Sequence, residues 1–167
     1  ICCIVVPGLL LAGTPAGGRV KPNLIIILAD DLGYADLSCQ GSQDIRTPAI
    51  DELAGTGIRY TAGYVTSPQC GPSRAGLMTG IEPVRFNYQD NIIQEGLPDP
   101  SLVPLLPEVL KSAGYVTGVV GKWHIGDDPF HPDTEPWPEA PWRRGFDYTF
   151  IHGGGLSWYF PYSEEHQ

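Results

Sequence analysis

The fold is decided by the apolar run Leu24-Ile25-Ile26-Ile27-Leu28-Ala29, which is followed directly by Asp30-Asp31. An apolar run of this length, without alternating polar residues, is typical of a strand that is buried on both faces in a parallel sheet. Open α/β sheets bind their ligands at the carboxyl ends of such strands, which is where the two aspartates lie. The stretch therefore predicts an α/β fold, with a mostly parallel sheet flanked by helices.

Asp30 and Asp31 are adjacent carboxylates, so they repel each other unless a cation lies nearby. Carboxylate oxygens are hard ligands that suit calcium or magnesium. An acidic turn in contact with solvent, leading into Gly33, would have the same sequence. The pair on its own leaves both interpretations open.

A second informative stretch is Cys70-Gly71-Pro72-Ser73-Arg74. Proline and serine are accepted in the first turn of a helix, and the apolar residues that follow continue a short helix until Gly80. Cys70 is therefore expected at the positive end of a helix dipole, with Arg74 one turn further on. Backbone N–H groups at that end favour an anion such as sulfate or phosphate.

Other elements follow from local signals. Helices are expected in residues 47–57, where Pro48 takes the first position, and in the later half of residues 101–112, because prolines precede it. Residues 58–65 and 115–120 contain β-branched and aromatic residues and are predicted as strands, the first delivering the chain to Cys70. Residues 81–100 and 127–142 are rich in proline and polar residues and are expected to be irregular.

Lys122 and His124 follow the predicted strand 115–120 and lie two positions apart. An extended backbone would point both side chains the same way, and together they could bind an oxyanion and carry a proton. A surface lysine beside an ordinary histidine is the alternative. Because parallel strands end on one rim of a sheet, we expect Asp30, Cys70 and Lys122 to share that rim.

Two runs carry a resemblance to a known family. Cys70-x-Pro72-Ser73-Arg74-x-x-Leu77-x-Thr79-Gly80 and Gly114-Tyr115-x-Thr117-x-x-x-Gly121-Lys122-x-His124 resemble the two signatures of the formylglycine-dependent sulfatases, in the alkaline phosphatase-like superfamily. Residues 143–148 resemble the Gly-Phe-Asp turn of the same family. The resemblance covers residues 21–148 and implies an alkaline-phosphatase-like fold, incomplete at this length.

The resemblance also implies a mechanism. A formylglycine-generating enzyme would oxidise Cys70 to an aldehyde, whose hydrated form attacks the sulfur of a sulfate ester. Asp30, Asp31 and the modified Cys70 would hold calcium, or magnesium in its place. Arg74 and Lys122 would balance charge on the sulfuryl group, and His124 would hold the diol or relay its proton.

The ends of the sequence suggest its organisation. Residues 1–18 are apolar and then rich in small residues, which is typical of a signal segment and predicts export to the periplasm or outside the cell. A buried strand is the alternative, and the run is too short to span a membrane. Residues 19–167 are then the first part of a sulfatase catalytic domain. Sulfatases take an Asp-Asn pair, a lysine and a histidine from a later segment that is absent here, so we expect little activity alone and an exposed apolar sheet edge.

Composition and cysteine content limit the partners and the alternative functions that the sequence allows. The formal net charge of −9 argues against nucleic acid as a partner, because phosphates require basic faces. The expected partners are a sulfated small molecule or glycan and the oxidising enzyme. A Cys39–Cys70 disulfide, a phosphatase or phosphonate hydrolase of the same superfamily, and a non-catalytic module that binds sulfated glycans stay open as alternatives. Aryl, glycosaminoglycan and algal polysaccharide esters are all compatible with the sequence.

Overall fold

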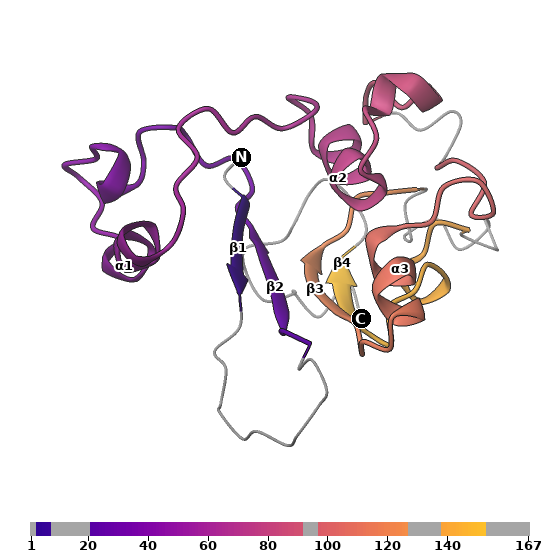
Figure 1. Cartoon of the computed structure of the whole chain (residues 1–167). Coiled ribbons are helices and arrows are strands. Elements are labelled where there is room, and N and C mark those ends of the chain that lie inside the picture. The colour runs from indigo at the N-terminus through magenta and orange to yellow at the C-terminus, as the bar shows by residue number, and fades with distance from the viewer. Residues whose placement is uncertain (1–2, 8–20, 92–96, 127–137, 153–167) are drawn as a thin grey trace, which may run out of the picture. The chain divides into compact units, whose positions relative to one another are not determined.

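The structure is a computed structural model of the chain, and it describes residues 3–7, 21–91, 97–126 and 138–152. The chain divides into two compact units, residues 1–64 and residues 65–167. Each unit is described by itself, with its elements labelled in Figure 1.

In the first unit, strand β1 (Cys3–Pro7) pairs with strand β2 (Leu24–Leu28), as Figure 1 shows. The predicted strand at β2 is confirmed, but its pairing with β1 is antiparallel rather than parallel. The predicted burial of this strand on both faces is wrong, since Ile25 and Ile27 are 52% and 54% exposed. β1 is the one neighbour of β2 among the described residues. Apart from Cys3–Pro7, the predicted signal segment lies outside the described residues.

The first unit also contains the 3-10 helix η1 (Ser38–Gln40) and helix α1 (Pro48–Thr56). The predicted helix is confirmed, with Pro48 in its first turn and Gly57 as its C-cap. Asp51 joins the two elements, because its Oδ1 accepts hydrogen bonds from the Cys39 N–H at 2.8 Å and the Thr47 hydroxyl at 3.1 Å. Local capping signals therefore position this helix correctly.

The strand predicted for residues 58–65 is wrong. The structure has irregular chain there, and Ile58, Tyr60 and Tyr64 are 82%, 79% and 90% exposed. A strand requires a neighbour that satisfies its backbone groups, and these residues have none within the described part of the chain. In the second unit, Thr66 packs closely against Gly76 of the helix that follows, and a residue larger than glycine would not fit at position 76.

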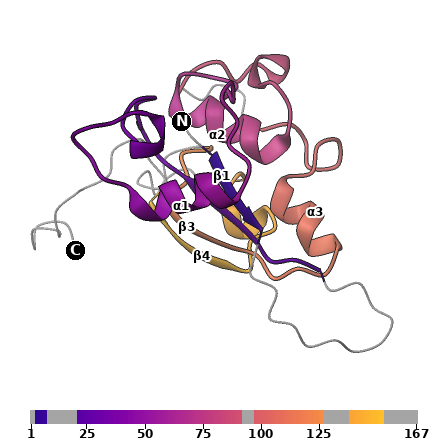
Figure 2. The same ribbon diagram turned by 60° about the vertical axis from the view of Figure 1, so that its left-hand side comes forward.

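The second unit contains strands β3 (Gly118–Lys122) and β4 (Tyr148–His152), which pair in parallel and lie side by side in Figures 1 and 2. β3 begins later than the predicted strand 115–120. The reason is Thr117, whose N–H and hydroxyl bond to Asp147 and Gly145 rather than to a neighbouring strand. The regular ladder therefore starts at the next residue, with Gly118 opposite Tyr148.

Helix α2 (Cys70–Thr79) ends as predicted at Gly80, whose φ of 68° is left-handed. Helix α3 (Leu106–Ser112) occupies the later half of the predicted segment and has Pro107 in its first turn. Short 3-10 helices, η2 (Pro83–Phe86) and η3 (Pro141–Arg143), interrupt the predicted loops; residues 92–96 and 127–137 lie outside the described residues. None of the described helices is long and apolar enough to cross a membrane.

The core of the second unit is built around Trp123, which is 2% exposed and packs with Leu105, Ile125 and Ala140. The indole meets the ring of Phe146 edge-on at a centroid distance of 5.7 Å, and its Nε1–H donates to the carbonyl oxygen of Glu139 at 3.0 Å. A buried aromatic ring with its polar group satisfied fixes the backbone on either side. Those neighbours are Lys122 and His124.

The Gly-Phe-Asp turn ties α3 to β3. Arg144 is 3% exposed, and its Nε donates to Glu108 of α3 at 2.8 Å. Asp147 accepts from the ammonium group of Lys111 at 2.6 Å and from the N–H of Thr117 at 2.9 Å. These contacts lower the pKa of the Asp147 carboxyl, the Lys111 hydrogen bond most strongly and the Thr117 N–H next. The turn is therefore a structural joint between the helix and the sheet.

Candidate functional site

Cys70 is the first residue of α2, as predicted, and is partly exposed, whereas Gly71, Pro72 and Ser73 are buried. Gln69 before it is extended, and its carbonyl oxygen accepts the first helical hydrogen bond from the Ser73 N–H at 3.0 Å. Residue 70 therefore lies where the backbone changes from extended to helical. Orphan N–H groups and the positive end of the dipole lie at this position.

Arg74 connects α2 with β3. Its Nη1 donates a hydrogen bond of 2.6 Å to the carbonyl oxygen of Lys122, the last residue of β3. The two predicted motifs, which are 48 residues apart at this point, are therefore in direct contact. Arg74 and Lys122 place two cationic side chains on neighbouring elements of the same unit.

His124 does not continue the extended backbone of Lys122, in contrast to the prediction from the sequence. Its φ is 51°, in the left-handed region, because the chain leaves the sheet after the Trp123 N–H bonds to the His152 carbonyl oxygen at 3.0 Å. The alternation argument for His124 is therefore wrong. A residue other than glycine in this region carries backbone strain, which occurs often at functional sites.

His124 nevertheless lies against the start of α2. A Cβ atom on Gly71 would come within 3.2 Å of the His124 carbonyl oxygen and within 3.1 Å of the Tyr88 hydroxyl oxygen. Because Gly71 has no side chain, the backbone of the Lys122–His124 turn can lie close to the first turn of α2, directly after Cys70. The structure brings together the helix start and this turn, and with them Cys70, Arg74, Lys122 and His124.

Asn91 is a contact that the sequence did not reveal. Its Oδ1 accepts the N–H of Gly71 at 2.9 Å, and its own N–H donates to Gln69 Oε1 at 2.8 Å. The residue lies in the segment 81–100, to which the sequence assigned no chemistry. Contacts between residues 20 and 22 positions apart have no local sequence signal.

Asp30 and Asp31 belong to the first unit, directly after β2, and both are exposed. Asp31 has a φ of 57°, so the chain turns sharply at the pair. Two adjacent carboxylates offer the hard oxygen ligands that calcium and magnesium prefer. The expected position of both aspartates beside Cys70 at one rim of the sheet stays a prediction, because Cys70 belongs to the second unit and each unit is described separately.

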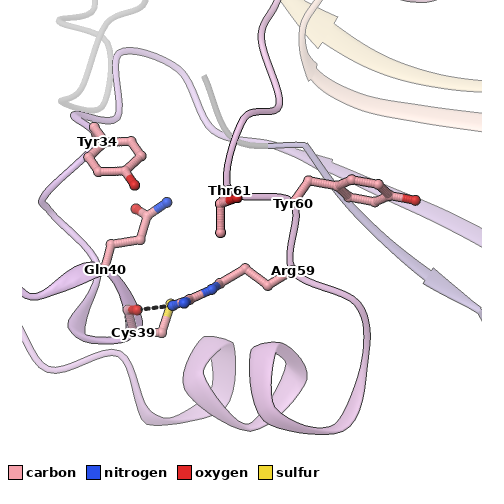
Figure 3. Close-up of a pocket in the computed structure, with 6 residues that line it drawn as sticks. All are labelled: Tyr34, Cys39, Gln40, Arg59, Tyr60 and Thr61. Carbon is pink, nitrogen blue, oxygen red and sulfur yellow. Dashed lines mark hydrogen bonds between the residues drawn. The ribbon is translucent and has the colours of Figure 1, made fainter.

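The alternative of a disulfide between Cys39 and Cys70 is not supported, since both are free thiols. Cys39 contributes to a pocket of about 120 Å³ in the first unit, shown in Figure 3 and lined by Tyr34, Cys39, Gln40, Arg59, Tyr60 and Thr61. There the guanidinium group of Arg59 donates to the Cys39 carbonyl oxygen. None of the predicted site residues lines this pocket.

Comparison with known proteins identifies the family. The family described as Sulfatase matches residues 22–166, which is most of the chain. The chain belongs to the sulfatase family. The resemblance read from the Cys70 and Lys122 motifs is therefore confirmed.

Similar sulfatases include N-acetylgalactosamine-6-O-sulfatase of Bacteroides thetaiotaomicron, 45% identical over 78% of this chain and 26% of the relative. Arylsulfatase A of Homo sapiens is 43% identical over 74% of this chain and 25% of the relative. The crystal structure of Ps i-CgsB is similar with a TM-score of 0.64 and 43% identity, over 76% of this chain and 27% of that chain. The alkaline-phosphatase-like α/β class is confirmed, and the chain spans about a quarter of the length of these proteins.

Proposed function

We propose that this chain supplies the nucleophile and the cationic part of an active site that hydrolyses sulfate esters. The observation that carries the proposal is the contact between Arg74 and Lys122, which joins the cysteine motif to the Lys-x-His motif. The names of the relatives support two substrate classes, sulfated N-acetylgalactosamine and aryl sulfates. We therefore propose an aryl or carbohydrate sulfate as the substrate.

Each site residue has a role in this proposal. Cys70, a partly exposed free thiol at a helix start, is the residue that a formylglycine-generating enzyme would oxidise. Formylglycine would supply the hydroxyl nucleophile. Arg74 and Lys122 would stabilise the negative charge that develops on the sulfuryl oxygens, and His124 would hold or transfer a proton.

Calcium, or magnesium in its place, fits the donor set of Asp30, Asp31 and the modified Cys70. The two aspartates are exposed and offer carboxylate oxygens, which are the ligands of choice for these ions. Such an ion would acidify a bound hydroxyl and orient a sulfate oxygen. Calcium takes about six to eight oxygen ligands, more than these residues supply, so further ligands must come from outside this set. For that reason we propose that the chain alone has little or no activity.

The first experiment is mass spectrometry of the Cys70 peptide after co-expression with a formylglycine-generating enzyme. The proposal expects the aldehyde, whose mass reflects an oxygen atom in place of the sulfur and the loss of two hydrogen atoms, while the Cys39 peptide in the same digest keeps its thiol. If Cys70 also stays a thiol in a host that matures another sulfatase, the proposal fails and a module that binds sulfated glycans is favoured.

The second experiment is a chimaera in which this chain replaces the matching quarter of the Bacteroides relative. Rates on matched aryl sulfate and aryl phosphate esters then separate a sulfatase from a phosphatase or phosphonate hydrolase. We expect faster hydrolysis of the sulfate, and a clearly faster phosphate reaction would overturn the assignment. The intact Bacteroides protein is the reference.

A further inference from the structure

We propose that His152, the last residue of β4, is a substrate-binding residue that hydrogen-bonds to a hydroxyl group of a carbohydrate sulfate. The inference deepens the proposed function and rests on it, because it narrows the substrate from aryl or carbohydrate esters to the carbohydrate class. None of the roles proposed above uses His152.

The first argument is the position of His152 in the sheet. β3 and β4 are parallel, and their register places His152 directly opposite Lys122. Opposed residues project from the same face of a sheet, and neighbouring strands lie about 4.8 Å apart. The two strands lie side by side (Figure 1) and end at the same edge, where α/β sheets bind their ligands. His152 therefore lies next to a residue that is proposed to contact the sulfuryl group.

The second argument is that the backbone fixes this position. The carbonyl oxygen of His152 accepts the N–H of Trp123, a core residue, at 3.0 Å. The preceding carbonyl oxygen, that of Lys122, accepts from Arg74 of α2 at 2.6 Å. The end of β4, the end of β3 and the start of α2 are thus joined by successive hydrogen bonds. These bonds use the backbone of His152, so its imidazole ring is available for another role.

The third argument is the state of that ring. Its Nδ1 is buried and has no hydrogen-bond partner in the part of the chain that the structure describes. A buried polar atom without a partner destabilises a fold, so each such atom requires a physical explanation. Tyr148 and Phe150 precede His152 on the same face of β4, and an apolar residue would continue this pattern at no such cost. A bound ligand would supply the missing partner.

The fourth argument concerns the chemistry of the ligand. Lysine and arginine side chains donate hydrogen bonds and do not accept them, so Lys122 and Arg74 suit the sulfuryl oxygens. An imidazole nitrogen can also accept, and a hydroxyl group has a proton to donate. Sugar rings carry hydroxyl groups near a sulfate ester, whereas an unsubstituted aryl sulfate has none. His152 is therefore suited to distinguish the two classes of ester.

The test measures equilibrium binding to the chimaera with the Bacteroides relative, produced without the oxidising enzyme so that Cys70 stays a thiol and turnover is avoided. The probes are N-acetylgalactosamine 6-sulfate and phenyl sulfate, each followed by ligand-observed NMR titration. His152→Ala removes the imidazole ring, and His152→Asn keeps a hydrogen-bonding group near the position of Nδ1. Thr149→Ala is the matched control, because Thr149 is exposed on the opposite face of the same strand.

We expect His152→Ala to weaken binding of the sulfated sugar about fivefold to tenfold, as the loss of one hydrogen bond predicts, and binding of phenyl sulfate less than about twofold. His152→Asn should recover most of the affinity for the sugar, and Thr149→Ala should match the wild type. An equal loss for both probes, or an unchanged affinity for the sugar, would overturn the inference.

A purely structural role for His152 would give a different result in thermal unfolding. Because Nδ1 has no partner in the described residues, His152→Leu should melt at the wild-type temperature or above it. A clear fall in melting temperature would contradict the inference, since it would show that the imidazole ring serves the fold.

The wild-type chimaera separates failure of this inference from failure of the proposed function. Binding of phenyl sulfate without binding of the sulfated sugar would overturn the inference alone. A chimaera that binds neither probe, and that hydrolyses no sulfate ester after maturation, would contradict the proposed function as well.

Discussion

The guanidinium group of Arg74 donates a 2.6 Å hydrogen bond to the carbonyl oxygen of Lys122 and so fastens the start of α2 to the end of β3. The bond uses one donor of a group that has several, so the same side chain can hold the two elements together and present positive charge to a ligand. Arg74 is thus expected to affect both stability and ligand binding.

Arg74→Lys should destabilise the second unit by about 1–2 kcal/mol, because an ammonium group does not reproduce the position of Nη1 and leaves the partly buried carbonyl without this donor. Urea unfolding measures the loss. Arg85→Lys is the control, since Arg85 is exposed in η2 and the same exchange there should change stability little. Equal effects of the two exchanges would contradict a structural role for Arg74.

Gly145→Ala should destabilise the fold by about 2 kcal/mol or more. Gly145 has a φ of 92°, and an added Cβ atom would lie 2.6 Å from the backbone nitrogen of Glu108, which cannot move aside cheaply. Gly118→Ala is the matched exchange in the same unit, because its nearest neighbours are 3.8 Å away. Thermal unfolding should separate the two variants, and similar melting temperatures would argue against the close approach of the turn to α3.

Asp147 predicts a pH-dependent contribution to stability. Its pKa is lowered in the folded state, first by the Lys111 hydrogen bond and then by the Thr117 N–H. A group with a lowered folded pKa stabilises the protein above its unfolded pKa, and this contribution is lost as the pH falls through the folded value. Wild type and Asp147→Asn should therefore differ most in unfolding free energy near neutrality and converge below about pH 4. A difference that stays constant from about pH 7 to about pH 3 would contradict this assignment.

Calcium binding should depend on the aspartate pair. In the chimaera with the Bacteroides relative, we expect added calcium to raise the melting temperature, and Asp31→Asn to weaken calcium binding by about tenfold or more, because a carboxylate ligand is lost. Isothermal titration measures the affinity directly. Asp44→Asn removes the same charge from another exposed position of the first unit and should have little effect. Equal affinities for both variants would exclude Asp31 as a ligand.

The helices could be predicted because their signals are local. Pro48 opens α1, Gly80 closes α2, and Pro107 marks the first turn of α3. The motifs around Cys70 and Lys122 were identified in the same way, each within a short run of sequence. Capping residues act within one helical turn, so the sequence near each end contains the information needed.

Pairing and long-range contacts could not be predicted from local sequence. Residues 58–65 have the composition of a strand but no neighbour among the described residues, whereas β4 was not predicted although Tyr148-Thr149-Phe150-Ile151 is rich in strand-forming residues. The bonds of Asn91 and the pair of Arg144 with Glu108, which are 36 residues apart, depend on how distant segments fold back. The left-handed backbone at His124 likewise follows from where the sheet ends.

The exposed isoleucines of β2 have a practical consequence for anyone who produces this chain. Ile25 and Ile27 lie on one side of a two-stranded ribbon, and each is more than half accessible to solvent. A newly synthesised chain that exposes such an apolar face tends to bind chaperones and to aggregate into inclusion bodies. Ile25→Lys should improve the recovery of soluble material while leaving every residue of α2 untouched.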